Sequence, residues 1–233
     1  MPLAFLAPSI PVVLLLSAIP CFAMSGPRPR AAVGIAQAAV VASLVAAAAL
    51  GALLVLHGPR TNEILDVGAL AFGTRLDSVS VAMTLLVAFV GCVVVRYASF
   101  YLDGESRQGP FMGWLLVTLS TVVLLVLAGH LSQLVLAWIA TSLALHRLLL
   151  FYAERPNAQR AARKKFLVAR LGDVALVAAA GLLARAYGTG DIATILSAAR
   201  DGVGGSLAVF AAVLLALAAI LKSAQFPAHG WLI

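Results

Sequence analysis

The chain has 233 residues, of which 63% are hydrophobic and only 11% are charged. A soluble domain is about 45–50% apolar and about 25% charged, so this chain lacks the polar side chains to cover a water-soluble surface. A net charge of +7 often favours nucleic acid as a partner, but in so apolar a chain basic residues more often mark the cytoplasmic ends of membrane helices. The composition therefore excludes a disordered chain, a soluble enzyme and a nucleic-acid-binding domain, and it indicates an integral membrane protein in a lipid bilayer.

Seven stretches are apolar and long enough to cross a bilayer, which takes about 20 residues as a helix. In chain order they are Leu3–Met24, Ala31–Leu56, Asp77–Tyr97, Phe111–Ala128, Leu131–Tyr152, Phe166–Tyr187 and Leu207–Leu221. We expect an all-α polytopic membrane protein whose first helix is not cleaved as a signal peptide, because no Lys or Arg precedes its apolar core.

Three segments between these spans have distinct compositions. Residues 58–76 alternate short apolar runs with Gly, Asn and Asp, which predicts a small external hairpin. Residues 153–165, AERPNAQRAARKK, predict a solvated cytoplasmic linker that runs into a helix start. Residues 190–206 are rich in Gly and predict a short surface helix followed by a turn.

The distribution of the 16 basic residues predicts the orientation of the chain. With the N-terminus outside, nine of them fall in inner loops and only four in outer loops, which satisfies the positive-inside rule. The inner set is Arg28, Arg30, Arg96, Arg107, Arg155, Arg160, Arg163, Lys164 and Lys165. Seven crossings then leave the last residue of this chain on the cytoplasmic side.

Two charged residues of the sixth span are candidates for an ion path. Arg170 and Asp173 are spaced i, i+3, so they share one helical face and can neutralise each other. An intramembrane ionisable residue is a functional hypothesis by default, and the carboxylate of Asp173 is too short to reach the membrane surface. The residues themselves favour a structural ion pair and a proton-path element equally.

The fifth span carries His146 and Arg147 side by side. Adjacent helical residues point about 100° apart, so the two need not face the same cavity. His146 titrates near physiological pH and is suited to a proton relay, although a single histidine in a helix is more often a packing residue. Arg147 is close enough to the end of the span to extend to the membrane surface.

Lys222 ends the seventh apolar stretch but is not followed by a charged loop. The sequence continues as SAQFPAHGWLI, with His229 after Pro227, which predicts a helix broken near Pro227. Broken helices expose backbone and polar side chains to internal ion paths. The functional interpretation is a proton-carrying lysine with His229 nearby, and the alternative is a lysine that reaches the inner membrane surface.

The sequence offers no motif for other chemistry. It has no GxGxxG, GxxxxGK[ST], HExxH or GxSxG pattern, so we expect no cofactor, no metal and no enzymatic activity in this chain.

Three runs of the sequence resemble one superfamily. KSAQFPAHGWL, which begins at Lys222, is similar to the KSAQxPxHxWLP motif of the large antiporter-like subunits of respiratory complex I and of multi-subunit cation/proton antiporters. KKFLVARLGD resembles their KAFxxNRxGD motif, and residues 75–102 resemble their third span. The resemblance implies a proton- or cation-conducting bundle of two inverted five-helix repeats, each with a buried lysine on a broken helix. Lys222 matches that lysine, and Arg170 and Asp173 match the charged pair of the preceding helix.

The fifth helix departs from the superfamily pattern. A Gly-Trp-Glu run there supplies the lysine's glutamate partner, whereas this chain has Ala137-Trp138-Ile139. Its TSLALHRLLLFY run, followed by AARKKF, resembles the membrane subunit of the DAB inorganic-carbon transporters. That resemblance implies an energy-coupled bicarbonate or CO2 pump of the bacterial inner membrane, driven by protons or sodium ions. It also implies a large peripheral zinc-binding, carbonic-anhydrase-like partner. Our own hypothesis is that His146 acts as a relay in place of the glutamate.

The resemblance also predicts how the chain is organised. Residues 1–110 would hold the first three helices and the external loop 58–76, and residues 111–233 an incomplete first antiporter-like repeat. Because family members continue beyond the WL of the motif, we expect a fragment or truncated product. The alternatives are a proton-pumping subunit of NADH:quinone oxidoreductase, a cation/proton antiporter subunit, and a non-conducting scaffold left by truncation.

Overall fold

The computed structural model describes the chain except residues 1–5, 27–28, 68–69, 153, 155 and 224–233. The described part contains seven helices that are long and apolar enough to cross a membrane, as the hydropathy pattern predicts. The chain divides into two compact units: Met1–Asn62 with Thr74–Ala128, and Glu63–Gly73 with Gly129–Ile233. The division at residue 110, which derives from the family's repeat, stays a prediction.

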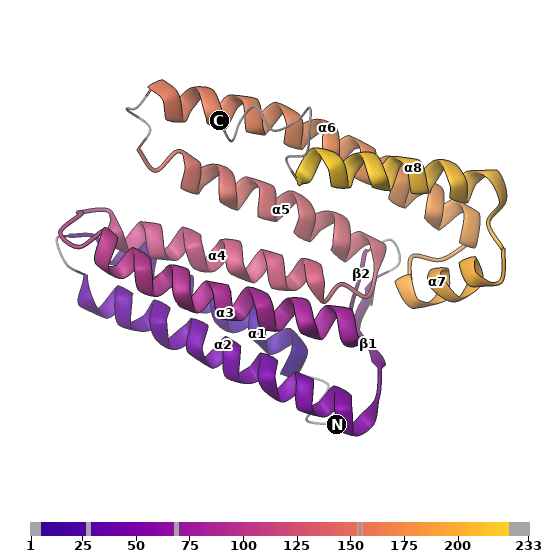
Figure 1. Ribbon diagram of the computed structural model, residues 1–233, viewed down its shortest axis with the longest axis horizontal. Helices are drawn as coiled ribbons and strands as arrows, with labels where there is room; N and C mark the ends of the chain where they lie inside the picture. The colour runs from indigo at the N-terminus through magenta and orange to yellow at the C-terminus, as the bar shows by residue number, and fades with distance from the viewer. Residues whose placement is uncertain (1–5, 27–28, 68–69, 153, 155, 224–233) are drawn as a thin grey trace. The chain divides into compact units, whose positions relative to one another are not determined.

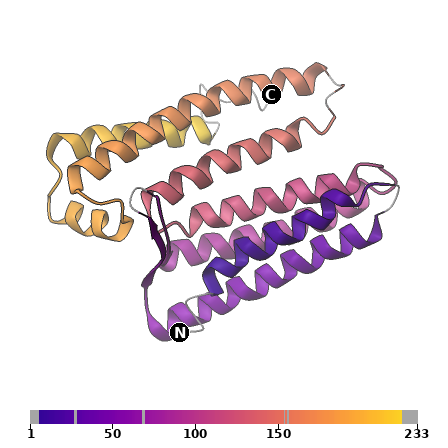
Figure 2. The same cartoon turned by 180° about the vertical axis from the view of Figure 1, so that it is seen from behind.

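The first unit is a bundle of four helices, seen from opposite sides in Figures 1 and 2. They are α1 (Leu6–Ala23), α2 (Arg30–His57), α3 (Ser78–Tyr101) and α4 (Gln108–Val126). The helix α1 packs against α4 and α2, and α2 packs against α3. The buried face of α2 consists largely of alanines, among them Ala32, Ala36 and Ala47, and small residues let membrane helices approach closely.

The contact between α1 and α4 depends on glycine. A Cβ at Gly109 would collide with the backbone oxygen of Met24, and one at Gly113 would press on the ring of Phe22. The Phe22 ring meets Trp114 edge-on at a centroid distance of 5.2 Å, and the Ser120 hydroxyl donates to the Pro11 carbonyl over 2.7 Å.

Replacement of Gly109 by alanine is expected to destabilise the first unit. Because a backbone atom blocks the new methyl group, the helices must shift, which typically costs about 1–3 kcal/mol. The melting temperature in detergent should fall by several degrees. Gly51→Ala is the matched control, since its Cβ would make only ordinary contact, 3.7 Å from Val81 Cγ1. Equal melting temperatures for the two variants would contradict this packing.

The N-terminus of α3 is held by a capping box. The Asp77 carboxylate accepts from the Ser80 backbone N–H over 2.8 Å, and the Ser80 hydroxyl accepts from the Asp77 N–H over 2.9 Å. Arg75 forms an ion pair with Asp77 at 2.9 Å. Burial raises the pKa of Asp77, but the hydrogen bonds from Ser80 and the charge of Arg75 outweigh it and leave the pKa below its ordinary value.

This lowered pKa predicts an acid-sensitive helix start. A depressed carboxyl pKa contributes stability above the unfolded-state value and loses it as the pH falls through the folded-state value. Asp77→Ala should cost about 0.5–2 kcal/mol at neutral pH through loss of the cap. Asp77→Asn keeps a cap and should show a smaller drop in melting temperature than the wild type between pH 5 and 3; an unchanged drop would contradict the assignment.

The second unit contains the remaining helices and part of the hairpin. Its helices are α5 (Leu131–Leu149), α6 (Pro156–Tyr187), α7 (Ile192–Arg200) and α8 (Gly205–Lys222). The strands β1 (Arg60–Val67) and β2 (Leu70–Leu76) pair with each other, as predicted for residues 58–76. The helix α7 is the short helix that was predicted within residues 190–206.

The first turn of α5 is anchored by its neighbours in this unit. The Ser132 hydroxyl donates to the Ala71 carbonyl over 2.8 Å, and the Gln133 side chain accepts from the Gly73 N–H over 2.9 Å. The side chain of His130 caps the helix by accepting from the Ser132 N–H. This ring lies so close to Gly190 that a Cβ there would collide with it.

The prediction of a solvated linker over residues 153–165 is wrong for most of that length, because α6 begins at Pro156 and is 32 residues long. Proline is favoured in the first helical turn, and the Ala, Gln, Arg and Lys residues that follow are good helix formers. Hydropathy detects only the apolar part of such a helix. Lys165, which was predicted to lie in an inner loop, therefore belongs to α6, and it is only 7% exposed.

Candidate functional site

Three helices of the second unit, α5, α6 and α8, build the candidate site. The helix α6 packs along α8 and against α5. Ala175, Leu176 and Ala218 form a buried core, against which Trp138 packs. Gly172 faces α8, and a Cβ there would make an ordinary contact, 3.5 Å from that of Leu221. These small residues place the end of α8 beside the middle of α5.

Two lysines reach backbone carbonyls of α5. The Lys222 Nζ donates to the Trp138 carbonyl over 2.9 Å and lies 4.1 Å from the centroid of the Trp138 ring, a cation–π contact. The Lys165 Nζ donates to the Ser142 carbonyl over 2.7 Å. Because Trp138 and Ser142 are four residues apart, the two carbonyls lie one turn apart on one face of α5.

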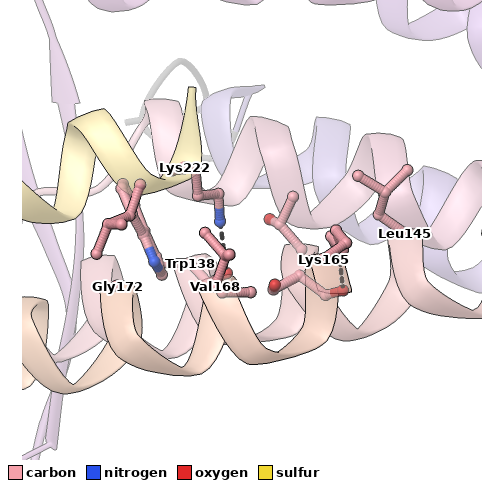
Figure 3. Close-up of a pocket in the computed structure, with 10 residues that line it drawn as sticks. Trp138, Leu145, Lys165, Val168, Gly172 and Lys222 are labelled. Atoms are coloured by element: carbon pink, nitrogen blue, oxygen red, sulfur yellow. Dashed lines mark hydrogen bonds between the residues drawn. The ribbon is translucent and has the colours of Figure 1, made fainter. Parts of the chain in front are cut away.

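A small cavity lies between these groups, as Figure 3 shows. Its volume is about 70 Å³, and one water needs about 10–15 Å³ of such space. The lining residues come from all three helices: Trp138, Thr141, Ser142, Leu145, Lys165, Val168, Ala169, Gly172, Leu221 and Lys222. Both ammonium groups therefore border one internal space in which water or a small ion fits.

Arg170 and Asp173 form an ion pair on the adjoining face of α6. Arg170 Nη2 lies 2.6 Å from Asp173 Oδ2. The geometry of this contact is not that of a hydrogen bond, and in the described part of the chain the Asp173 carboxylate has no other hydrogen-bond partner. The Asp173 residue is 6% exposed. Its charge and that of Arg170 act on both Lys165 and Lys222. The pair thus belongs electrostatically to the lysine cavity.

The other predicted site residues lie apart from the cavity lining. The His146 ring is half-buried, and its centroid lies 5.2 Å from that of the Phe166 ring. The Arg170 Cζ lies over the same Phe166 ring, 5.1 Å from its centroid. Arg147 is exposed, in line with the 100° between adjacent helical positions. His229, like the predicted break at Pro227, falls outside the described residues.

Lys165 is the site residue that the sequence reasoning missed. Lys165, Val168, Ala169 and Gly172 all line the cavity, and their i, i+3, i+4, i+7 spacing marks one helical face. Extending that face backward from the apolar span would have found Lys165. Among the residues described, no three His, Cys, Asp or Glu side chains are grouped to hold a metal ion.

Residues 128–233, which contain this cavity, match the family model described as "NADH:quinone oxidoreductase/Mrp antiporter, TM". Residues 65–112 match "NADH-Ubiquinone oxidoreductase (complex I), chain 5 N-terminus". The chain belongs to the antiporter-like membrane subunits of the complex I and Mrp superfamily.

Individual relatives agree with this assignment to the antiporter-like subunits. The chain is 44% identical over 168 residues to a probable inorganic carbon transporter subunit, DabB2, of Halothiobacillus neapolitanus, covering 71% of this chain and 30% of the relative. It is 42% identical over 160 residues to DabB of Hydrogenovibrio crunogenus, covering 68% and 31%. Against NADH-quinone oxidoreductase subunit L of Escherichia coli, identity is 33% over 165 residues, covering 70% and 27%.

A solved structure shows the same antiporter-like fold. The Mrp complex from Dietzia sp. DQ12-45-1b superposes with a TM-score of 0.75 at 26% identity, covering all of this chain and 25% of that one. The chain thus spans about a third of the length of the curated relatives it matches, and about a quarter of the Mrp chain.

Proposed function

We propose that this antiporter-like subunit is the membrane component of an inorganic-carbon pump. Relatives named as inorganic carbon transporter subunits are 44%, 42% and 38% identical, whereas subunit L of Escherichia coli is 33% identical. The TSLALHRLLLFY run at residues 141–152 supports this choice, because it resembles the membrane subunit of the inorganic-carbon transporters.

The depth of Lys222 is the observation that carries the ion-conducting role. Trp138, whose carbonyl it contacts, lies seven residues after the start of α5, about 10 Å along the helix axis. This position along α5 supports a place for Lys222 within the bilayer rather than at its surface. A lysine in that position, beside a cavity and a buried carboxylate, can take up and release a proton on either side of the bundle.

The proposal assigns a role to each part of this site. Lys222 is the proton or cation carrier, Lys165 the second cationic group of the path, and Arg170–Asp173 the pair that adjusts their charge. His146 is a relay toward the cytoplasmic end. The coupling ion is H⁺ or Na⁺, and the ion gradient drives bicarbonate accumulation through a large peripheral zinc-binding, carbonic-anhydrase-like partner.

The proposed location is the bacterial inner membrane, with the N-terminus outside and residue 233 toward the cytoplasm. The positive-inside asymmetry supports this orientation: without the buried Lys165, eight basic residues remain on the inner side against four outside.

Complementation tests the proposed function. A bacterium that lacks inorganic-carbon uptake grows only in elevated CO2, and expressing the chain with its zinc-protein partner should restore growth in air. Neither component alone should do so. The second candidate, a proton-pumping subunit of NADH:quinone oxidoreductase, is favoured by the match to subunit L. Restoration of NADH-driven proton pumping in a strain without subunit L, with no growth in air, would replace our proposal by that one.

A further inference from the structure

The two lysines converge on one cavity from different helices. Lys165 comes from α6 and Lys222 from α8, and both donate to carbonyls one turn apart on α5. We propose that the cavity binds one small monovalent oxyanion between the two ammonium groups. The choice of bicarbonate as that anion rests on the proposed function, whereas the anion site rests on charge and geometry.

The charges around the cavity do not balance. Lys165, Lys222 and Arg170 bring three cationic groups, and Asp173 is the carboxylate that acts on them, already 2.6 Å from Arg170. The sequence of α5, which forms the opposite wall, contains neither Asp nor Glu. Buried charges without a partner are costly, so one anion between the lysines would remove much of that cost.

Hydrogen-bond donors are available for such an anion. A lysine ammonium has three N–H donors, and each of these lysines directs one to an α5 carbonyl of the described chain. The remaining N–H groups can turn toward the cavity between them. A planar oxyanion can accept hydrogen bonds from both ammonium groups at once through different oxygens. A single water molecule could accept hydrogen bonds there, but it carries no negative charge.

The size and lining of the cavity restrict the anion. The volume of about 70 Å³ accommodates an ion of a few non-hydrogen atoms. Leu145, Val168 and Leu221 make the rest of the wall apolar, which disfavours a divalent anion because it would have to give up more hydration. Bicarbonate, with four non-hydrogen atoms and one negative charge, fits both conditions.

Binding of ¹³C-labelled bicarbonate to the 233-residue chain in lipid nanodiscs tests this site. Saturable broadening of the bicarbonate NMR signal at pH 8 is expected, with competition by nitrate, another planar monovalent oxyanion, and not by sulfate. Lys165→Gln and Lys222→Gln should each weaken binding by about tenfold or more. Lys164 is the exposed neighbour of Lys165 on the same helix, so the Lys164→Gln variant should bind bicarbonate like the wild type.

The outcomes separate this inference from the proposed function. Absence of saturable binding, competition by sulfate as strong as by nitrate, or equal loss in Lys164→Gln would overturn the anion site. If a lysine variant fails to fold, the nitrate and sulfate competition on the wild type still decides. Proton flux in liposomes from the same preparations then tests the carrier role separately: flux without bicarbonate binding removes the anion site alone, and binding without flux removes the carrier role alone.

Discussion

Lys222→Met is expected to abolish growth in air in cells that depend on this chain for inorganic-carbon uptake. Methionine has a similar length and keeps the apolar contacts of the stem, but it can neither bind nor release a proton. The fold should lose the hydrogen bond to the Trp138 carbonyl and the cation–π contact with the Trp138 ring, each about 1 kcal/mol. The growth rate in air should fall to that of cells without the protein, while growth in elevated CO2 and the amount of membrane-inserted protein stay normal.

Lys164→Met is the matched control for this prediction. Lys164 is adjacent to the buried Lys165 in sequence but exposed, so the same loss of charge should leave growth in air unchanged. Normal growth of the Lys222→Met strain would contradict the assignment of the carrier. Equal loss in both variants would point instead to a general effect of charge on insertion.

Asp173→Asn is expected to lower the free energy of unfolding more than Gly109→Ala or Asp77→Ala does. It removes the carboxylate beside Arg170 and leaves three cations near the cavity. Breaking a buried ion pair typically costs about 3–5 kcal/mol. The Arg170 side chain is 34% exposed, so solvent screening places the expected loss near the lower end, about 3 kcal/mol. Thermal unfolding in detergent at neutral pH measures it.

The double variant Arg170→Gln/Asp173→Asn distinguishes ion pairing from packing. Removing both charges should restore part of the stability that the single Asp173→Asn change loses, because no guanidinium is left without its carboxylate. A double variant less stable than Asp173→Asn by the full effect of Arg170→Gln would show that the two side chains act independently, against the account of this site.

Hydropathy was enough to predict the membrane fold. Each crossing helix contains a continuous apolar run, and the bilayer sets its length, so all seven spans agree with the structure within a few residues at most ends. The hairpin at residues 60–76 was predictable because its composition switches from continuous to interrupted apolar runs. The start of α6 was not, because residues 156–165 form a helix by propensity and not by hydropathy.

The candidate site was predictable in its members but not in its arrangement. Arg170 and Asp173 share a face by spacing alone, and the structure pairs them. That Lys222 meets Trp138, in the middle of another helix, depends on the packing of α8 along α6 through Leu176 and Ala218. Such tertiary depth leaves no local mark in a sequence. Lys165 was missed for a different reason: the helical face that it shares with Val168, Ala169 and Gly172 extends beyond the apolar run that hydropathy detects.

Proton flux through liposomes that contain the purified chain measures directly whether Lys222 carries the ion. A potassium gradient with valinomycin sets the membrane potential, and a dye inside the liposomes reports the pH. We predict flux for the wild type and for Lys164→Met, and for Lys222→Met the rate of protein-free liposomes. Flux through Lys222→Met at the wild-type rate would contradict the claim that this lysine carries the ion.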